Sequence, residues 1–181
     1  PNRPDKPVER AGRRLFGNPD EVFLQSRPKR GLLTPAEVRC TALAEMNLTR
    51  DSIVWDIGAG SGAVSVEAAQ IAAEGTVYAV EMDVEDYQLI AANATRFGVQ
   101  NLVPVLGKAP EAWAGLPDPD AIFVGGTGRQ VGQIVRQSYR RLRVGGSLVV
   151  SVRSIENVAA VRRVFLDANV DDKVWMVNFA R

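Results

Sequence analysis

Asp56-Ile-Gly-Ala-Gly-Ser-Gly62 is the stretch of this 181-residue sequence that decides its fold. It joins a short apolar run at 53–57, typical of a buried strand, to a helical pattern at 63–73. Three alternate glycines allow a tight turn and let the backbone approach a ligand closely. In open α/β sheets such turns lie at the carboxyl ends of strands, where ligands bind. The stretch therefore predicts a loop that holds a nucleotide-like ligand.

The same alternation of strand and helix continues along the chain. Apolar runs predict strands at 53–57, 76–81, 102–106, 121–124, 147–152 and 174–179. Helical patterns lie between them at 63–73, 84–97, 130–142 and 155–168, with a weak one near Glu111. Before the first strand, Thr34 is the expected N-cap of a helix, with Pro35 as its first residue and Glu37 as the capping-box partner. Continuous apolar strands that alternate with helices predict an α/β fold of the Rossmann-like type, a mostly parallel sheet with helices on both faces.

Two features of the loop indicate which ligand it holds. Gly58, Gly60 and Ala63 satisfy the dinucleotide pattern G-x-G-x-x-G/A, but this match alone is weak. A carboxylate at Asp56 suits a ligand with an ammonium and a sulfonium group and repels a pyrophosphate, and Gly62 adds a third glycine. The loop therefore favours S-adenosyl-L-methionine (S-adenosylmethionine) over a dinucleotide as cofactor, and a class I methyltransferase as the class of protein.

Further cofactor contacts are expected at the ends of the second and third strands. Glu81 ends the second strand, where an acidic side chain accepts hydrogen bonds from both ribose hydroxyls. Gly107-Lys108-Ala109 follows the third strand and is expected along the adenine edge, with Ala109 as a backbone contact. The residues that this reasoning assigns to the cofactor are Asp56, Gly58, Ala59, Gly60, Ser61, Gly62, Glu81 and Ala109.

The composition limits the chemistry of the chain. With one cysteine and no histidine, the sequence excludes an internal disulfide, a zinc site of several thiolates, a His-ligated metal and a histidine triad. No metal is expected, and no catalytic residue is assigned. Methyl transfer from a sulfonium fits, because the cofactor is itself the activated electrophile. A net charge of +1 argues against a nucleic-acid surface, and no apolar run approaches the ~20 residues of a membrane span, so we expect a soluble, cytoplasmic protein.

The first 30 residues differ from the rest of the chain. They carry eight Lys and Arg against four Asp and Glu, with prolines and glycines and no sustained period. We predict an N-terminal arm or linker at 1–30 and a methyltransferase domain at 31–181. The arm is either solvated or presents Arg27, Lys29 and Arg30 to an anionic substrate. A seven-stranded methyltransferase sheet ends in an antiparallel hairpin, and only its first strand is expected here, so the domain is predicted to lack its last strand.

Six segments of the sequence resemble one methyltransferase family. They are NPDEVF at 18–23, LTPAEVRC at 33–40, WDIGAGSGAVSVE at 55–67, YAVE at 78–81, GKAPEAW at 107–113 and FVGGTG at 123–128. Together they make the chain similar to the decarboxylating precorrin-6B C15-methyltransferases of cobalamin biosynthesis, which occur alone or as the C-terminal half of a fused C5,15-methyltransferase. Many methyltransferases share the glycine loop, whereas the threonine-led first helix and the Gly-Gly-Thr-Gly segment are more specific.

The resemblance implies a reaction, an assembly and one more cofactor contact. It implies methylation of a precorrin-6B-like tetrapyrrole at C15 and loss of carbon dioxide from its C12 acetate. It also implies a homotetramer and a contact between Thr34 and the cofactor. The arm before Asn18 is longer than a stand-alone enzyme needs, which suggests the tail of a linker to a fused C5-methyltransferase domain. Whether the substrate carries cobalt is left open by the sequence.

Glycines and arginines beyond the fourth and fifth strands are the candidates for substrate binding. Gly125, Gly126 and Thr127 belong to a run that suggests close approach by a bulky planar substrate. Arg129 and Arg153 lie at the carboxyl end of the sheet, where they either meet the carboxylates of a tetrapyrrole or are ordinary surface arginines. The sequence has no Asn-Pro-Pro-Tyr-like segment there, which disfavours an amino group as methyl acceptor. A carbon acceptor needs little help from a general base, and holding it in line with the donor methyl group supplies much of the rate.

Two alternative functions remain open at this point. One is another class I methyltransferase that modifies RNA or protein, for which the basic arm is the discriminating feature and which the near-neutral charge disfavours. The other is a non-catalytic module that binds the cofactor and assembles a pathway complex. Asp56, Glu81 and the glycine loop argue against such a module, although they indicate binding rather than turnover.

Overall fold

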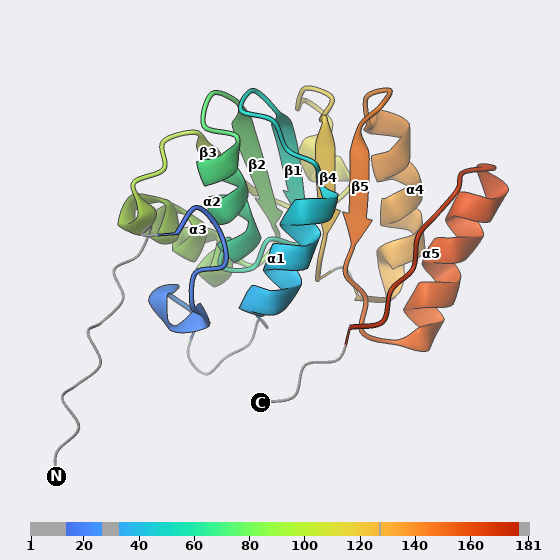
Figure 1. Cartoon of the computed structure of the whole chain (residues 1–181), viewed down its shortest axis with the longest axis horizontal. Coiled ribbons are helices and arrows are strands. Elements are labelled where there is room, and N and C mark those ends of the chain that lie inside the picture. Colours follow the sequence, from blue (N-terminus) through green and yellow to red (C-terminus); the bar gives the residue numbers. More distant parts are fainter. Residues whose placement is uncertain (1–13, 27–32, 127, 178–181) are drawn as a thin grey trace, which may run out of the picture.

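The computed structural model describes residues 14–26, 33–126 and 128–177. Its centre is a five-stranded sheet in the order β3-β2-β1-β4-β5, in which every pair of neighbours runs parallel (Figure 1). The strands are β1 (Ile53–Ile57), β2 (Thr76–Glu81), β3 (Leu102–Leu106), β4 (Ala121–Val124) and β5 (Ser147–Val150). These are five of the six predicted strands, and their parallel order confirms the predicted α/β fold.

Helices connect the strands, as the periodicity predicts. They are α1 (Ala36–Glu45), α2 (Ala63–Ile71), α3 (Val84–Phe97), α4 (Val131–Arg141) and α5 (Ile155–Asp167), with short 3-10 helices η1 (Asp20–Val22), η2 (Glu111–Trp113) and η3 (Gly128–Gln130). The strands β2 and β3 extend the sheet on one side of β1, and β4 and β5 extend it on the other. Ligands of open α/β sheets bind beyond the carboxyl ends of the strands at such a switch in strand order.

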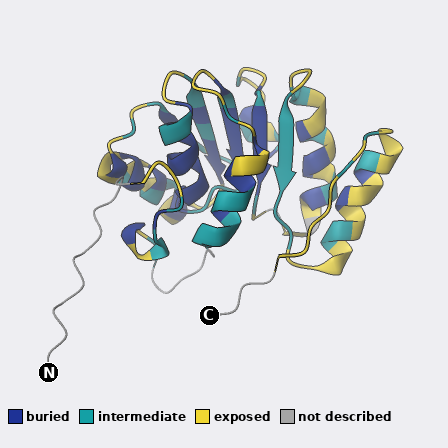
Figure 2. Ribbon diagram, in the orientation of Figure 1, coloured by how far each residue is buried: buried dark blue, intermediate teal, exposed yellow. Residues whose placement is uncertain are grey.

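Strand side chains alternate between two apolar layers that cover the sheet. Val54, Ala79 and Phe123 belong to the layer with α1, α2 and α3, whereas Trp55 and Ile57 belong to the layer with α4, α5 and η2. Successive side chains of a strand point to opposite faces of the sheet. Helices therefore cover both faces, as predicted, and Figure 2 shows the central strands buried between them.

The start of α1 differs from the prediction by one residue. Pro35 is the N-cap, with φ −56° and ψ 150°, and no side chain caps the helix. Glu37 is then the second helical residue instead of the third, so the predicted capping box from Thr34 is wrong. The Thr34 carbonyl instead accepts a hydrogen bond of 2.5 Å from the buried guanidinium of Arg39. The backbone at Thr34 is thus held by a side chain of the helix that follows it.

The sixth predicted strand, at 174–179, is wrong for the residues that the structure describes. Residues 174–177 are not in a strand, and the remaining two positions lie outside the described part of the chain. A strand needs a partner for its N–H and C=O groups, and within the described residues β5 pairs with β4 alone. The segment after α5 instead runs back beside that helix (Figure 1), where Asp172 pairs with Arg162 at 3.3 Å.

Part of the predicted N-terminal arm packs against the rest of the chain. Val22 and Phe23 are buried in the layer that holds α1, α2 and α3, and Asn18 is almost fully buried. Residues 1–13 and 27–32, which include three of the arm's cations next to the domain, lie outside the described residues. The domain boundary at residue 30 therefore stays a prediction.

Candidate functional site

The loop between β1 and α2 has a left-handed backbone at each of its three glycines. The φ angles are +73° at Gly58, +56° at Gly60 and +81° at Gly62. A Cβ at Gly58 would lie 2.9 Å from the amide nitrogen of Gly126, and one at Gly62 would lie 3.2 Å from Ile90. A Cβ at Gly60 would meet nothing within 4 Å. The loop is therefore in close contact with the segment after β4 and with α3, while space is open at its middle glycine.

Backbone N–H groups hold the Glu81 carboxylate beside this loop. Oε2 accepts a hydrogen bond from the Gly60 N–H at 2.8 Å. Oε1 accepts from the N–H groups of Met82 and Asp83 at 2.8 and 2.9 Å. The residue is 8% exposed, and a carboxylate offers about four acceptor positions. Three are used here, so Glu81 is fixed in place and retains acceptor capacity for a ligand.

Asp56, the last residue but one of β1, is fully buried. Its Oδ2 accepts a hydrogen bond of 2.5 Å from the Ser65 hydroxyl of α2, and its Oδ1 has no hydrogen-bond partner among the described residues. Burial raises the pKa of Asp56 to about 7; the Ser65 hydrogen bond opposes this rise, and the Glu81 carboxylate adds to it. One carboxyl oxygen is therefore left for a polar or cationic partner.

A cavity of about 430 Å³ lies at the loops that follow β1 and β4. Nine residues that the sequence assigns to the cofactor or the substrate line it, namely Thr34, Gly58, Ala59, Gly60, Ser61, Glu81, Gly125, Gly126 and Arg153. The structure thus brings residues from before α1, from the end of β2 and from after β1, β4 and β5 to one hollow. Thr127 lies outside the described residues, and the Arg129 side chain is not described.

Three residues assigned to the cofactor are not among the cavity's lining residues. Asp56 is buried against α2 through Ser65, and Gly62 lies against Ile90 of α3. Ala109 is 9% exposed and packs in the apolar layer with α4 and α5. Asp56 and Gly62 shape the loop from behind, while a backbone contact from Ala109 stays a prediction.

Several lining residues carry no motif that sequence reasoning used. They are Gln25 and Ser26 before α1, Asp86 in the first turn of α3, and Ser151, Val152 and Asn157 after β5. Burial raises the pKa of Asp86; a hydrogen bond with Ser26 opposes this rise, and the carboxylates of Glu81, Asp83 and Glu85 add to it. These residues come together only through the fold, and the only local signal for Asp86 is an acidic residue in the first turn of a helix.

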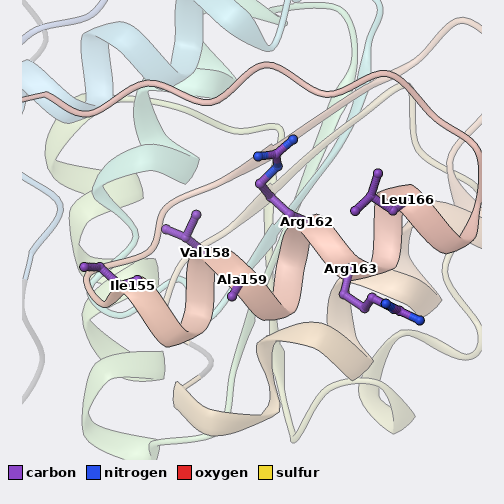
Figure 3. Close-up of a pocket in the computed structure, with 6 residues that line it drawn as sticks. All are labelled: Ile155, Val158, Ala159, Arg162, Arg163 and Leu166. Atoms are coloured by element: carbon purple, nitrogen blue, oxygen red, sulfur yellow. The ribbon is translucent and has the colours of Figure 1, made fainter.

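A second hollow lies on the outer face of α5 (Figure 3). Its lining residues are Ile155, Val158, Ala159, Arg162, Arg163 and Leu166, all from this one helix. The two arginines already pair with Asp172 and Asp167. Ligand sites usually gather polar groups from several elements, so the cavity at the glycine loop is the candidate active site.

The described part of the chain offers carboxylates and backbone groups at this site. In residues 14–26, 33–126 and 128–177, no three Cys, Asp or Glu side chains are grouped in a way that would hold a metal ion. Within the same ranges, no helix is both long and apolar enough to cross a membrane.

Comparison with known proteins places the chain among its relatives. The family model of the precorrin methyltransferase domain matches residues 28–171. A probable cobalt-precorrin-6B C(15)-methyltransferase (decarboxylating) of Pyrobaculum calidifontis is 40% identical over 167 residues, covering 91% of this chain and 84% of that protein. A precorrin-6Y C(5,15)-methyltransferase (decarboxylating) of a Sinorhizobium species is 41% identical over 123 residues, covering 67% of this chain and 29% of that protein. The crystal structure of a precorrin-6Y C5,15-methyltransferase from Geobacter metallireducens has a TM-score of 0.80 and 31% identity, covering 86% of this chain and 81% of that one.

The parallel sheet, the glycine loop after β1 and the carboxylate at the end of β2 define an enzyme of the class I methyltransferase type. The family match narrows this class. The chain belongs to the precorrin methyltransferase family, which confirms the resemblance drawn from its six sequence segments.

Proposed function

We propose that this enzyme is an S-adenosylmethionine-dependent C-methyltransferase that methylates C15 of a precorrin-6B-like tetrapyrrole and removes carbon dioxide from its C12 acetate. The observation that carries the proposal is the family match over residues 28–171, which span the glycine loop and most of the cavity lining. The name of the Pyrobaculum relative includes both the C15 methylation and the decarboxylation.

The residues around the loop fit S-adenosylmethionine. Glu81 keeps one acceptor position for a ribose hydroxyl, and the backbone at Gly60 leaves open space. The unpaired oxygen of Asp56 and the carboxyl of Asp86 provide a negative environment for a cation. Thr34 adds a hydroxyl to the same cavity. Bound there, the cofactor supplies a methyl group on a sulfonium, which is itself the electrophile.

The wall beyond β4 and β5 suits a flat anionic acceptor. Gly125 and Gly126 line the cavity without side chains, so a planar macrocycle is able to approach their backbone. Arg153 lines the cavity, is exposed and makes no ion pair with any described residue. A guanidinium binds carboxylates through paired hydrogen bonds, so we assign Arg153 to a side-chain carboxylate of the tetrapyrrole. Thr127 and Arg129 are proposed to extend this wall.

The protein's part in the reaction is to position the acceptor. The titratable side chains among the described lining residues are Glu81, Asp86 and Arg153, and none is required as a base by an electron-rich carbon acceptor. Holding that carbon in line with the donor methyl supplies much of the rate. Loss of carbon dioxide leaves an electron pair that the conjugated macrocycle accepts, while the protein orients and desolvates the carboxylate.

We further propose a cytoplasmic homotetramer that is related to the fused C5,15-methyltransferases. Large apolar side chains are exposed at Val144, Ile155 and Leu166, which supports association between copies. This chain matches 29% of the Sinorhizobium relative, which supports a common origin with a longer enzyme whose name includes C5 as well as C15 methylation. Light scattering of the purified protein measures the assembly.

Incubation with labelled S-adenosylmethionine and either precorrin-6B or its cobalt form tests the proposed reaction. We expect label at C15 and a matching release of carbon dioxide from the C12 acetate. Comparison of the two substrates decides whether the enzyme requires the metal. A protein that binds S-adenosylmethionine but neither methylates nor decarboxylates either substrate would contradict the proposal and favour a non-catalytic module.

A further inference from the structure

One face of α3 is buried against the walls of the candidate active site. Its buried residues include Asp86, Ile90, Asn93 and Phe97, which recur at helical spacing. Ile90 lies against Gly62 of the glycine loop, and Phe97 stacks on Phe23 with ring centroids 4.6 Å apart. Asn93 lies between these two contacts and is 0% exposed. It is the polar side chain on this face for which the proposed reaction gives no role.

The Asn93 amide binds the backbone of two segments that are far apart in the sequence. Its Oδ1 accepts a hydrogen bond from the Leu24 N–H at 2.8 Å. Its Nδ2 donates to the Leu24 carbonyl at 3.0 Å and to the Ser61 carbonyl at 2.9 Å. Towards Leu24 the amide therefore acts as a neighbouring strand would, with one donated and one accepted bond. Its second donor is used for the glycine loop.

Both segments that Asn93 holds are parts of the cavity wall. Ser61 lines the cavity directly, and Leu24 is followed by Gln25 and Ser26, which also line it. A single rigid amide therefore fixes the separation between the glycine loop and the wall before α1. We infer that Asn93 is a positioning residue for the cofactor, which sets the width of the cavity by joining Ser61 to Leu24. This inference rests on the proposed use of S-adenosylmethionine.

The required chemistry explains why the residue is asparagine. The position needs one acceptor and two donors in a planar group, which the amide provides in full. Aspartate has no donor when ionised, and it would place a carboxylate oxygen against the carbonyls of Leu24 and Ser61. Alanine would leave those two carbonyls and one N–H unsatisfied in a buried place.

Asn101 offers a matched control for a purely structural role. Its Nδ2 donates to the carbonyls of Ala69, Ala72 and Gly75 at 3.1, 2.7 and 3.4 Å. This amide also binds backbone that is far from it in the sequence, but all three carbonyls belong to the end of α2 and the turn after it, remote from the glycine loop. Asn101→Ala therefore removes comparable hydrogen bonds without contact to a cavity wall.

The experiment compares Asn93→Ala and Asn101→Ala in the full chain. Thermal melting measures the loss of stability, and calorimetric titration with S-adenosylmethionine, without tetrapyrrole, measures the affinity. We expect both variants to melt at lower temperature, but the dissociation constant to rise roughly tenfold or more for Asn93→Ala alone, as for a lost interaction of about 1.4 kcal/mol. Equal affinities in the two variants would overturn the inference. Failure of the wild type to bind S-adenosylmethionine would instead overturn the proposed function together with it.

Hydrogen exchange of the wild type supplies a measurement that does not depend on folding of a variant. The Leu24 N–H donates directly to Asn93, so its exchange reports on this bridge. We expect added S-adenosylmethionine to slow exchange in the peptide around Leu24 as well as in the loop around Ser61. Protection of the loop alone would show that the two walls are not coupled and would refute the positioning role. Calorimetric titration and hydrogen exchange both measure cofactor binding, so their results do not depend on whether the enzyme methylates a precorrin.

Discussion

The substitution Asp56→Asn tests how the buried carboxyl group changes the stability of the fold with pH. Burial raises the pKa of Asp56 from 3.8 to about 7, so the folded protein holds a proton that the unfolded chain has lost over this range. Stability contributed by this group is present at low pH and is lost as the pH rises towards 7. Asparagine mimics the neutral acid, accepts from Ser65 in the same place and has no such titration.

The expected magnitude follows from the span of this titration. Between pH 5 and pH 8 the wild type loses about 3 kcal/mol of folding free energy through Asp56, because each pH unit below the folded pKa counts in full. Urea denaturation without cofactor measures the free energy of unfolding at each pH. The stability of Asp56→Asn relative to wild type is expected to rise by this amount and to level off above pH 7. Groups that do not interact with Asp56 titrate alike in the two proteins, so their contributions cancel in the difference.

Asp51→Asn serves as the control for this experiment. Asp51 is exposed, and hydrogen bonds with Thr49 and with its own backbone lower its pKa. It is therefore fully ionised across the whole range, and the difference from wild type is expected to be flat. A flat difference for Asp56→Asn as well would refute the raised pKa of the buried carboxyl. With a pKa of about 7, Asp56 of the wild type is mostly ionised at pH 8. Asp56→Asn removes this negative charge, so the variant is also expected to bind S-adenosylmethionine more weakly at pH 8.

Three further substitutions test the loop, the buried ion pair and the substrate wall. Gly58→Ala forces a left-handed alanine whose Cβ meets backbone 2.9 Å away, so we expect the free energy of unfolding to fall by ~2–3 kcal/mol in urea denaturation. The matched variant Gly60→Ala is expected to lose ~1 kcal/mol, because its Cβ meets nothing within 4 Å. Equal losses in the two variants would contradict the close contact at Gly58. Arg39→Met leaves Glu67 buried without its partner 3.2 Å away, and is expected to cost about 3–5 kcal/mol, part of which Glu67→Gln restores in the double variant. Arg153→Ala is expected to raise the KM for the tetrapyrrole roughly tenfold, as for the loss of one charge-assisted hydrogen bond. The affinity for S-adenosylmethionine is expected to stay unchanged. An unchanged KM would show that Arg153 does not bind the substrate.

The sheet and the glycine loop could be predicted because their signals are local. Each strand is a continuous apolar run, and each helix repeats its apolar residues within a few turns. The loop adds three glycines whose positive φ angles fit the turn that they predict. The two wrong predictions also have local causes. The N-cap of α1 is Pro35, one residue after the predicted Thr34, and residues 174–177 lack a partner strand among the described residues.

The residues that support the site could not be predicted in the same way. Asn93 meets Leu24 across 69 positions, and Arg39 meets Glu67 across 28. Such pairs have no periodic pattern, and in isolation each looks like a polar residue on a helix surface. Glu67 even lies in a helix of which seven residues are buried, yet among the described residues its carboxylate accepts hydrogen bonds from Arg39 and from the distant Asn18. Only the assembled fold shows that these side chains are internal.

The distribution of charge in the cavity argues that the two proposed ligands have separate ends. Glu81 and Asp86 line the part beside the glycine loop and α3, with Asp56 buried behind it. Arg153 follows β5, which lies on the other side of β1 from β2 in the strand order, and the neutral Ser151 and Asn157 line the same part of the cavity. A cationic cofactor is attracted to the first end, and an anionic tetrapyrrole is repelled from it and attracted to the second. The glycines after β4 lie between them in the strand order. We therefore propose that the methyl group is transferred beside these glycines, where the cavity wall has no side chains and the two ligands are able to approach most closely.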